Sequence, residues 1–192
     1  NASGTYGDPR YHDGDIGGGI YWAGQNGTLI NCLFDNNVAK IGGGLYYNSS
    51  ALGAKIINTT FSNNYALTNG GAIDCNASGM VLTNTRFISN HANYGAALCR
   101  EINATGGKGF NNTFIDNVAE TAGAALAWLN ATNISIDTYY FYGNSAGFTG
   151  GAIYVGEGSK NCEIINCVFG DNYVNDPTGY GGAIEWHSEK GK

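Results

Sequence analysis

Carboxylates are the side chains in this sequence best suited to chemistry, and their positions argue against a catalytic site. Hydrolysis of a glycosidic bond needs two carboxyl groups at a defined separation, and a calcium-dependent lyase needs an acidic cluster beside a proton-accepting base. Acids are dispersed through the repeated region, among them Asp35, Asp74, Asp116, Asp137, Asp171 and Glu185. Asp116 and Asp171 share a repeat position two coils apart, and they would stand about 10 Å from each other, at the outer limit for an inverting pair. We therefore predict no catalytic residues and a protein that is not an enzyme.

Metal-binding residues form no known motif either. The three histidines, His12, His91 and His187, lie far apart in the sequence, which supports neither a histidine metal site nor a catalytic triad. The one local cluster of acids, within residues 8–15, lacks the spacing of an EF-hand and fits a solvated loop. We predict no metal site and no cofactor.

The chain has five cysteines, an odd number: Cys32, Cys75, Cys99, Cys162 and Cys167. No CxxC pair occurs, so their spacing fits no zinc motif. The main interpretation is that they are small buried apolar side chains. A disulfide between Cys75 and Cys99 on successive turns is the alternative.

An internal repeat of about 27 residues positions all of these side chains. One motif reads GGGI, GGGL, GGAI or GAAL, and it ends at Ile20, Leu45, Ile73, Leu98, Leu126, Ile153 and Ile184. A second motif, FxxN, begins at Phe34, Phe61, Phe87, Phe114, Phe141 and Phe169. Three residues before these phenylalanines stand Asn31, Asn58, Asn84, Asn111, Thr138 and Asn166. So many positions in phase indicate a repeat architecture.

Each repeat contains three short apolar or β-branched runs, separated by Gly, Asn, Ser and Thr. Runs of this length are too short for a helical period. Three strands in about 27 residues are typical of a solenoid in which every strand pairs with its copy one coil away. We predict an all-β protein, a right-handed single-stranded parallel β-helix of about seven coils. Residues 1–192 would form a single repeat domain, a piece of a longer surface protein.

Stacking of like residues explains the choice of side chains. The Ile and Leu residues should form one inward column and the phenylalanines a second, with ring stacked on ring. Asn31, Asn58, Asn84, Asn111 and Asn166 should form a ladder of amides at a corner, because asparagine tolerates the left-handed backbone that a corner needs. Their amides should bond those of neighbouring coils, which would leave the glycosylation sequons at two of them, Asn58 and Asn111, inaccessible.

The residues beside the inward Ile and Leu are predicted to face outward. Small residues precede them, as at Gly44 and Ala72, and larger ones follow. Five of the following residues, a flat strip suited to a sugar chain or an extended peptide, are candidate ligand-binding residues: Tyr21, Tyr46, Asp74, Tyr154 and Glu185. The alternative is that Gly and Ala serve only tight packing between turns.

Bulky aromatic residues follow two positions after the Ile and Leu, at Trp22, Tyr47, Trp128 and Trp186. Alternation would direct them inward, but they are large for a narrow solenoid. We expect them to pack at a strand end or under a loop.

Composition and charge exclude several classes of partner. The net charge is −6, and the nine basic residues are scattered, so neither nucleic acid nor an anionic membrane is expected as a partner. No apolar run approaches the length that crosses a bilayer, so we expect no membrane insertion by this chain. Charged residues make up only 12% of the chain, about half the usual fraction, which favours β structure rich in tight turns.

The alternation of GGA[I/L] with FxxN resembles the repeats of chlamydial polymorphic outer-membrane proteins. The Asn- and Thr-rich style, as in GGLYYNSSALGAKIINTTFSNNYA, also resembles adhesin-like surface proteins of methanogenic archaea such as Methanobrevibacter. The resemblance runs from about Gly17 to Trp186. It implies a parallel β-helix on the extracellular cell surface with an adhesive or scaffolding role, and it supplies no catalytic residues.

The sequence and the resemblance leave three functions to be tested. The first is a non-catalytic adhesin-like module that attaches to a host or microbial cell surface through a glycan or protein. The others are a polysaccharide lyase or hydrolase and a purely structural stalk spacer. Exposed strand edges at both ends of a solenoid also predict end-to-end self-association.

Overall fold

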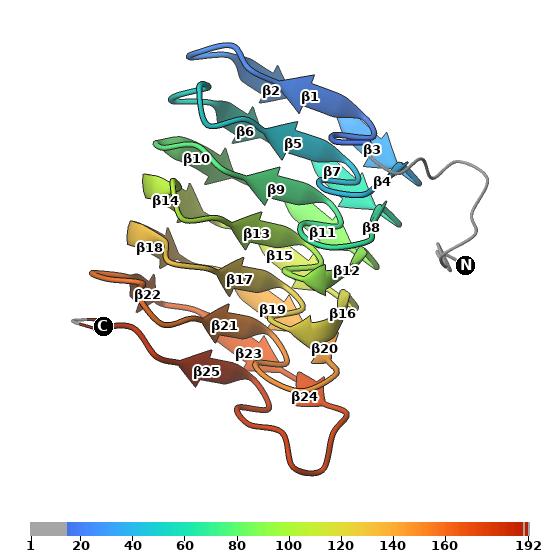
Figure 1. Cartoon of the computed structure of the whole chain (residues 1–192), viewed down its shortest axis with the longest axis vertical. Helices are drawn as coiled ribbons and strands as arrows, with labels where there is room; N and C mark the ends of the chain where they lie inside the picture. Colours follow the sequence, from blue (N-terminus) through green and yellow to red (C-terminus); the bar gives the residue numbers. More distant parts are fainter. Residues whose placement is uncertain (1–14, 190, 192) are drawn as a thin grey trace.

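The protein is a stack of coils in which four parallel sheets run side by side along the long axis (Figure 1). The computed structural model describes residues 15–189 and residue 191, and this part of the chain contains strands and no helix. Each sheet takes one strand from every coil. We number the sheets by the strand that the first coil contributes.

Sheet 1 contains β1 (Ile20–Trp22), β5 (Leu45–Tyr47), β9 (Ile73–Cys75), β13 (Leu98–Arg100), β17 (Leu126–Trp128), β21 (Ile153–Val155) and β25 (Ile184–Trp186). Sheet 2 contains β2 (Thr28–Ile30), β6 (Lys55–Ile57), β10 (Met80–Thr83), β14 (Thr105–Phe110), β18 (Thr132–Asp137) and β22 (Glu163–Ile165). Sheet 3 contains β3 (Leu33–Asp35), β7 (Thr60–Ser62), β11 (Arg86–Ile88), β15 (Thr113–Ile115), β19 (Tyr140–Tyr142) and β23 (Val168–Gly170). Sheet 4 contains β4 (Val38–Ala39), β8 (Tyr65–Ala66), β12 (His91–Tyr94), β16 (Val118–Ala122), β20 (Ser145–Ala146) and β24 (Tyr173–Val174).

Neighbouring strands pair in parallel and bring each residue against its copy in the next coil. Phe61 pairs with Phe34 on one side and with Phe87 on the other, as the repeat predicts. The parallel β-helix is therefore confirmed. Sheet 1 has seven strands and the other sheets have six, so the described chain makes six coils and one further strand.

Each coil adds a fourth short strand, in sheet 4, to the three that the sequence predicts. These strands carry the residue two positions after each FxxN asparagine. Five of these residues are buried alanines, Ala39, Ala66, Ala92, Ala119 and Ala146. All of them except Ala39 form, with Ala96 and Ala124, a small apolar cluster beside the main core. The small side chains allow the chain to bend tightly before it enters sheet 1.

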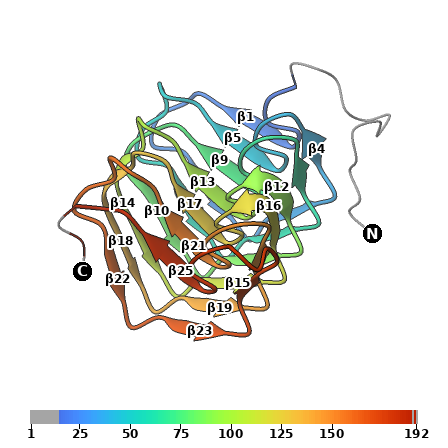
Figure 2. The same ribbon diagram turned by 60° about the horizontal axis from the view of Figure 1, so that its bottom comes forward.

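The four sheets enclose one interior, which Figure 2 shows from nearer the end of the stack. The phenylalanine rings stack face to face along it, with centroids 4.7 to 5.2 Å apart from Phe34 to Phe169. The predicted aliphatic column is equally buried, from Leu45 to Ile153. Both inward columns are confirmed, and each stacked aromatic pair contributes about 0.5–1.5 kcal/mol beyond its burial.

A ladder of buried amides runs beside the phenylalanine column and uses the asparagine of each FxxN motif. The Nδ2 of Asn64 donates to the Oδ1 of Asn90 and to the carbonyl oxygen of Phe34, at 2.9 and 3.0 Å. The Oδ1 of Asn64 accepts from the backbone N and the Nδ2 of Asn37. All hydrogen-bonding positions of this amide are thus used. The same pattern continues through Asn117, Asn144 and Asn172.

The predicted corner ladder lies on the outside of the molecule. All six residues at this repeat position have positive φ, between 47° and 58°, which confirms the left-handed corner. The amides of Asn58 and Asn111 donate to Asn31 and Asn84, at 2.6 and 2.8 Å, and Asn166 donates to Asp137. These asparagines are exposed, so the prediction that the sequons at Asn58 and Asn111 are inaccessible is wrong. The buried ladder is the one made by FxxN.

Bulky aromatic residues do fit inside the solenoid. Tyr47 and Trp128 are fully buried in the core, and Trp22 and Trp186 pack against it. Each of them is the last residue of its strand, so the expected place at a strand end is confirmed, whereas the expectation that they are too large for the interior is wrong for Tyr47 and Trp128. Room exists because the same position in the intervening coils carries smaller or flexible residues, Cys75 and Arg100.

Candidate functional site

The predicted ligand-binding residues form one row across the outward side of sheet 1. The register places Tyr21, Tyr46, Asp74, Cys99, Ala127, Tyr154 and Glu185 in successive coils. At the N-terminal end of the row, Tyr21 is 53% exposed and its ring stacks on that of Tyr46, with centroids 5.6 Å apart. The Nδ2 of Asn48 donates to the Tyr21 hydroxyl at 2.8 Å. This pair forms an ordered aromatic surface.

The C-terminal end of the row combines Tyr154, Glu185 and His187. A ring nitrogen of His187 lies 2.6 Å from Oε1 of Glu185, and the rings of His187 and Tyr154 meet edge to face at 6.1 Å. Burial and the nearby Glu185 carboxylate raise the pKa of Tyr154. Both Tyr154 and Glu185 are partly exposed.

The middle of the row is closed, so the prediction of a continuous binding strip is wrong. Asp74 is only 1% exposed, and Cys99 is fully buried. The cause is a contact across the sheet between Asn69, which precedes β9, and Glu101, which follows β13. Their side chains bond at 2.6 Å, from Nδ2 to Oε1. Asp74 therefore cannot contact a partner surface directly.

The lane of small residues before the Ile and Leu also faces inward, against the prediction. Ala72, Ala97, Ala125 and Ala152 belong to the main core. A methyl group added at Gly44 would lie 3.1 Å from Cδ1 of Phe61. The prediction assumed that side chains alternate inward and outward along an extended strand, but the chain bends before each sheet 1 strand and the alternation is lost there. Small residues are needed at this position because they cover the phenylalanine rings.

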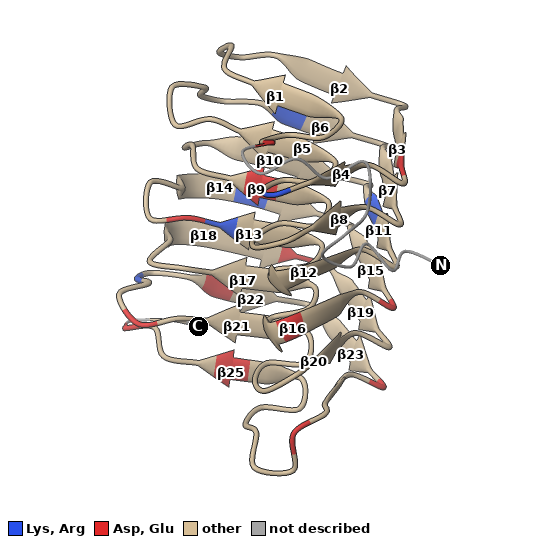
Figure 3. Ribbon diagram, turned by 45° about the vertical axis from the view of Figure 1, so that its right-hand side comes forward, with Lys and Arg blue, Asp and Glu red and all other residues tan. Residues whose placement is uncertain are grey.

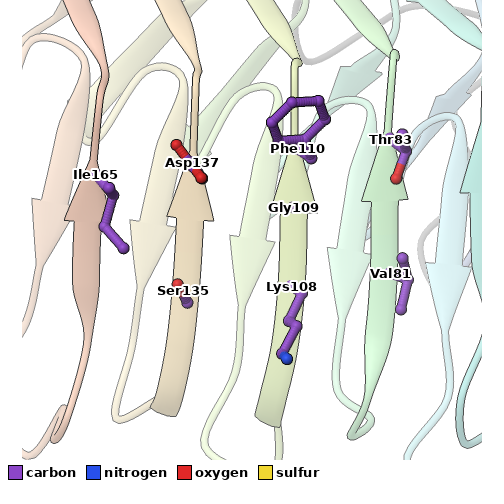
Figure 4. Close-up of a pocket in the computed structure, with 8 residues that line it drawn as sticks. All are labelled: Val81, Thr83, Lys108, Gly109, Phe110, Ser135, Asp137 and Ile165. Atoms are coloured by element: carbon purple, nitrogen blue, oxygen red, sulfur yellow. The ribbon is translucent and has the colours of Figure 1, made fainter.

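A second candidate surface lies on the outward side of sheet 2, where four neighbouring strands line a shallow depression of about 290 Å³ (Figure 4). One register row crosses it through Thr83, Phe110, Asp137 and Ile165. Lys108 stands on the same strand as Phe110. Phe110 is 52% exposed, and Asp137 is held by the Nδ2 of Asn166 at 3.0 Å.

Sequence reasoning did not identify the residues of this depression. Phe110, Asp137 and Ile165 follow one another at the repeat spacing, which was the available signal. Phe110 lies directly before the outer asparagine column, in a position that the repeat leaves variable. Variation at a surface position carries no pattern, so only the three-dimensional register brings these side chains together.

Acidic and basic residues are spread over many strands and loops (Figure 3). Asp35 accepts hydrogen bonds from Ser62 at 2.6 Å and Asn63 at 3.0 Å, and these bonds hold its pKa below the usual value. Asp116 and Asp171 lie in sheet 3 corners that have Gly143 between them. Two carboxyl groups, those of Asp74 and Glu101, come within 4.8 Å of each other, and the Glu101 carboxylate adds to burial in raising the pKa of Asp74.

All five cysteines are free thiols. Cys75 faces the core, whereas Cys99 pairs in register with Asp74 on the outward side. The two sulfur atoms thus lie on opposite sides of sheet 1, and the alternative of a Cys75–Cys99 disulfide is wrong. Burial raises the pKa of both thiols.

The fold and repeat define the chain as a parallel β-helix repeat protein, and comparison with known families is consistent with this. Residues 58–76 match the Chlamydia polymorphic membrane protein repeat. The matched segment runs from the outer Asn58 through the FxxN motif at Phe61 to the GGAI motif at Ile73. The resemblance to the chlamydial repeat is therefore confirmed.

A curated relative is the "Metabotropic glutamate receptor-like protein R" of Dictyostelium discoideum, which is 30% identical over 175 residues. The match covers 90% of this chain and 10% of the relative, so the chain spans about a tenth of that protein's length. No solved structure matches the chain. In the described part of the chain, no helix is long and apolar enough to cross a membrane.

Proposed function

We propose that this chain is a non-catalytic attachment module of a cell-surface protein, displayed outside the cell, and that it contacts its partner through the sheet 2 depression. The observation that carries the proposal is the row formed by Phe110, Asp137 and Ile165. An exposed aromatic ring, a fixed carboxylate and an aliphatic side chain stand side by side there (Figure 4). The chlamydial repeat and the resemblance to adhesin-like proteins of methanogens support a surface location.

The chemistry of the depression suits a sugar chain on the partner surface. Sugar rings stack on aromatic faces, and a few fixed polar groups orient them. Phe110 offers the ring, Asp137 on the neighbouring strand offers an acceptor, and Lys108, two residues earlier on the same strand as Phe110, offers donors. Asp137 is held in place by the amide of Asn166 and the hydroxyl of Thr138, so little side-chain freedom is lost on binding.

The solenoid supports this role because it holds its surface rigidly. Each strand of sheet 2 is bonded to its neighbours over several residues, with Lys108 and Phe110 paired to Ser135 and Asp137. The stacked rings and the buried amide ladder fix the coil spacing beneath. Sites built on rigid strands are more precise than sites on loops.

Catalysis is the competing function, from the class of polysaccharide lyases and hydrolases. The dispersed acids favour the non-catalytic alternative. A screen of the purified chain against polyuronides and neutral polysaccharides tests this, and turnover of any of them above the rate of a heat-denatured sample would contradict the proposal.

Binding to intact cells and to an array of glycans tests the attachment function. Phe110→Ser should weaken binding at least tenfold, because truncation of a central aromatic contact costs about 2 kcal/mol or more. Tyr21→Ser is the matched control: Tyr21 is as exposed as Phe110, at 53% against 52%, but lies on sheet 1.

Binding that falls with Tyr21→Ser and not with Phe110→Ser would move the contact surface to sheet 1. Absence of binding by the unaltered chain to every cell type and glycan would favour the third function, a structural spacer.

A further inference from the structure

A compact group of metal-ligating side chains lies on the outward side of sheet 1, apart from the sheet 2 depression. Asp74 on β9 pairs in register with Cys99 on β13, and Glu101 stands two residues beyond Cys99 on the same side. One carboxylate oxygen of Asp74, the sulfur of Cys99 and one carboxylate oxygen of Glu101 all lie within 4.8 Å of one another. The Sγ of Cys99 lies 3.9 Å from Oε1 of Glu101.

Asp74 is the unexplained member of this group. Its side chain is 1% exposed, and neither of its carboxylate oxygens has a hydrogen-bond partner. Buried polar atoms are nearly always paired, since an unpaired one is costly and a charged one more so. One of these oxygens instead lies within 4.8 Å of a thiol sulfur and of a second carboxylate oxygen, both of which are potential metal ligands.

The nearest basic residue in sequence does not neutralise the group. Arg100 lies between Cys99 and Glu101, so strand alternation directs its side chain to the other side of the sheet. Its guanidinium lies beside Gly107 of β14, within the interior. Two carboxyl groups and a thiol therefore meet on the outward side, and the part of the chain that the structure describes supplies no cation to them there.

We propose that Asp74, Cys99 and Glu101 bind a divalent metal ion of the zinc type. One sulfur and two carboxylate oxygens form a ligand set that zinc accepts, whereas calcium and magnesium prefer oxygen ligands alone. Ligands around a tetrahedral zinc ion stand about 3.3–3.8 Å apart, given its bond lengths of roughly 2.0–2.3 Å. Small rotations of the side chains would bring the three atoms to that spacing. A fourth position stays open for water.

The surroundings of the group fit a metal site. The Nδ2 of Asn69 donates to Glu101 and orients its carboxylate, in the way that outer partners orient metal ligands. Glu101 is partly exposed and provides the route of entry, while Asp74 and Cys99 exclude solvent. A bound ion would join β9 to β13 and so tie two coils together on the outside. This inference does not depend on the attachment function.

The alternative is that protons hold the group together without a metal. Burial, with the adjacent Glu101 carboxylate, raises the pKa of Asp74 well above its usual value. A metal ion must displace such protons, and binding should weaken as the pH falls.

Titration of the reduced chain with Co²⁺ tests the proposal, because cobalt reports thiolate ligation by a charge-transfer band. One equivalent should produce the band, Zn²⁺ should abolish it, and Zn²⁺ should raise the Tm while Ca²⁺ should not. Cys99→Ser should remove the band, and Cys167→Ser, in which a partly buried thiol elsewhere is replaced, should keep it. Asn69→Ala should weaken Zn²⁺ binding about 10–100-fold.

Asp74→Asn is a second test in case Cys99→Ser fails to fold, because asparagine keeps the shape of the aspartate side chain. This variant should weaken Zn²⁺ binding at least tenfold. Circular dichroism confirms the fold of every variant. Absence of a cobalt band and of a zinc-dependent rise in Tm in the unaltered chain would overturn the proposal in favour of the proton-sharing pair. A band that persists in Cys99→Ser would also overturn it.

Discussion

The phenol of Tyr139 occupies the space that Gly109 leaves free in the interior. Gly109 stands in register between Leu82 and Ile136, both buried aliphatic residues. A methyl group at Gly109 would overlap the Tyr139 hydroxyl. Tyr139 is itself fully enclosed and stacks on Phe114, with centroids 5.5 Å apart. Gly109 is smaller than its register neighbours Leu82 and Ile136, and Tyr139 is a large residue in the adjacent coil. The volume that Gly109 leaves is filled by Tyr139.

This compensation predicts strong coupling between the two positions. Gly109→Ile should destabilise the protein by about 1–3 kcal/mol through overpacking, and Tyr139→Thr should cost about 3–5 kcal/mol by leaving a cavity. The double variant should recover part of the loss, because it restores the residue types of the neighbouring coils. A double-mutant cycle by urea unfolding measures the coupling, and simple additivity would contradict the packing relationship.

Removal of one amide from the buried ladder should be costly. Asn117→Ala leaves the Nδ2 of Asn90, the Oδ1 of Asn144 and the carbonyl oxygen of Phe87 with fewer partners. We expect a loss of about 3 kcal/mol or more in the free energy of unfolding. Asn111→Gly in the exposed ladder is the control, with an expected loss below about 1 kcal/mol, because water replaces its bond. Equal losses in the two variants would show that burial of the ladder is unimportant.

The outer corner offers a stabilising substitution at Thr138. This β-branched residue has φ of 57°, a conformation that costs a non-glycine residue roughly 1–2 kcal/mol. Thr138→Asn should raise the free energy of unfolding by about 1 kcal/mol, although it removes the bond from the Thr138 hydroxyl to Asp137. Thr60→Asn, within an extended strand, should give no such gain. Urea unfolding of both variants checks the prediction.

Alkaline pH should destabilise the fold through Tyr139. Burial raises the pKa of its phenol above the ordinary value of 10, so above that pH the folded state holds a proton that the unfolded state has released. The free energy of unfolding should therefore fall as the pH rises past about 10, by up to about 1.4 kcal/mol per pH unit. Tyr139→Phe should lose this part of the slope. An unchanged slope in the variant, measured by urea unfolding between pH 9 and about 11, would contradict the assignment.

Repeated positions could be predicted from the sequence because stacking makes like residues equivalent. Phe61 and Phe87 share a column since each lies at the same point of its coil, and the same reasoning places Leu98 beside Leu126 in the aliphatic column. The fourth strand and the inward lane at Ala72 depend on a bend, which strand alternation does not describe. The small residues at both positions recur with the repeat, but their recurrence does not indicate the bend.

The candidate sites could be predicted only in part. The register row that contains Tyr21 and Asp74 was correct, but the burial of Asp74 depends on Asn69 and Glu101. These two lie in connecting segments at positions that do not recur in the repeat, so no column indicated them. Phe110 was missed because the residue type at its repeat position varies from coil to coil.

The buried amide ladder gives the molecule a direction. In the bonds between one asparagine side chain and the next, from Asn37 to Asn172, the Nδ2 always belongs to the N-terminal member of the pair and the accepting Oδ1 to the C-terminal member. If two molecules met through the same end of the solenoid, the two terminal amides of their ladders would present either two acceptors or two donors to each other. They could continue each other only head to tail, an arrangement that does not close into a symmetric dimer and extends instead into a filament.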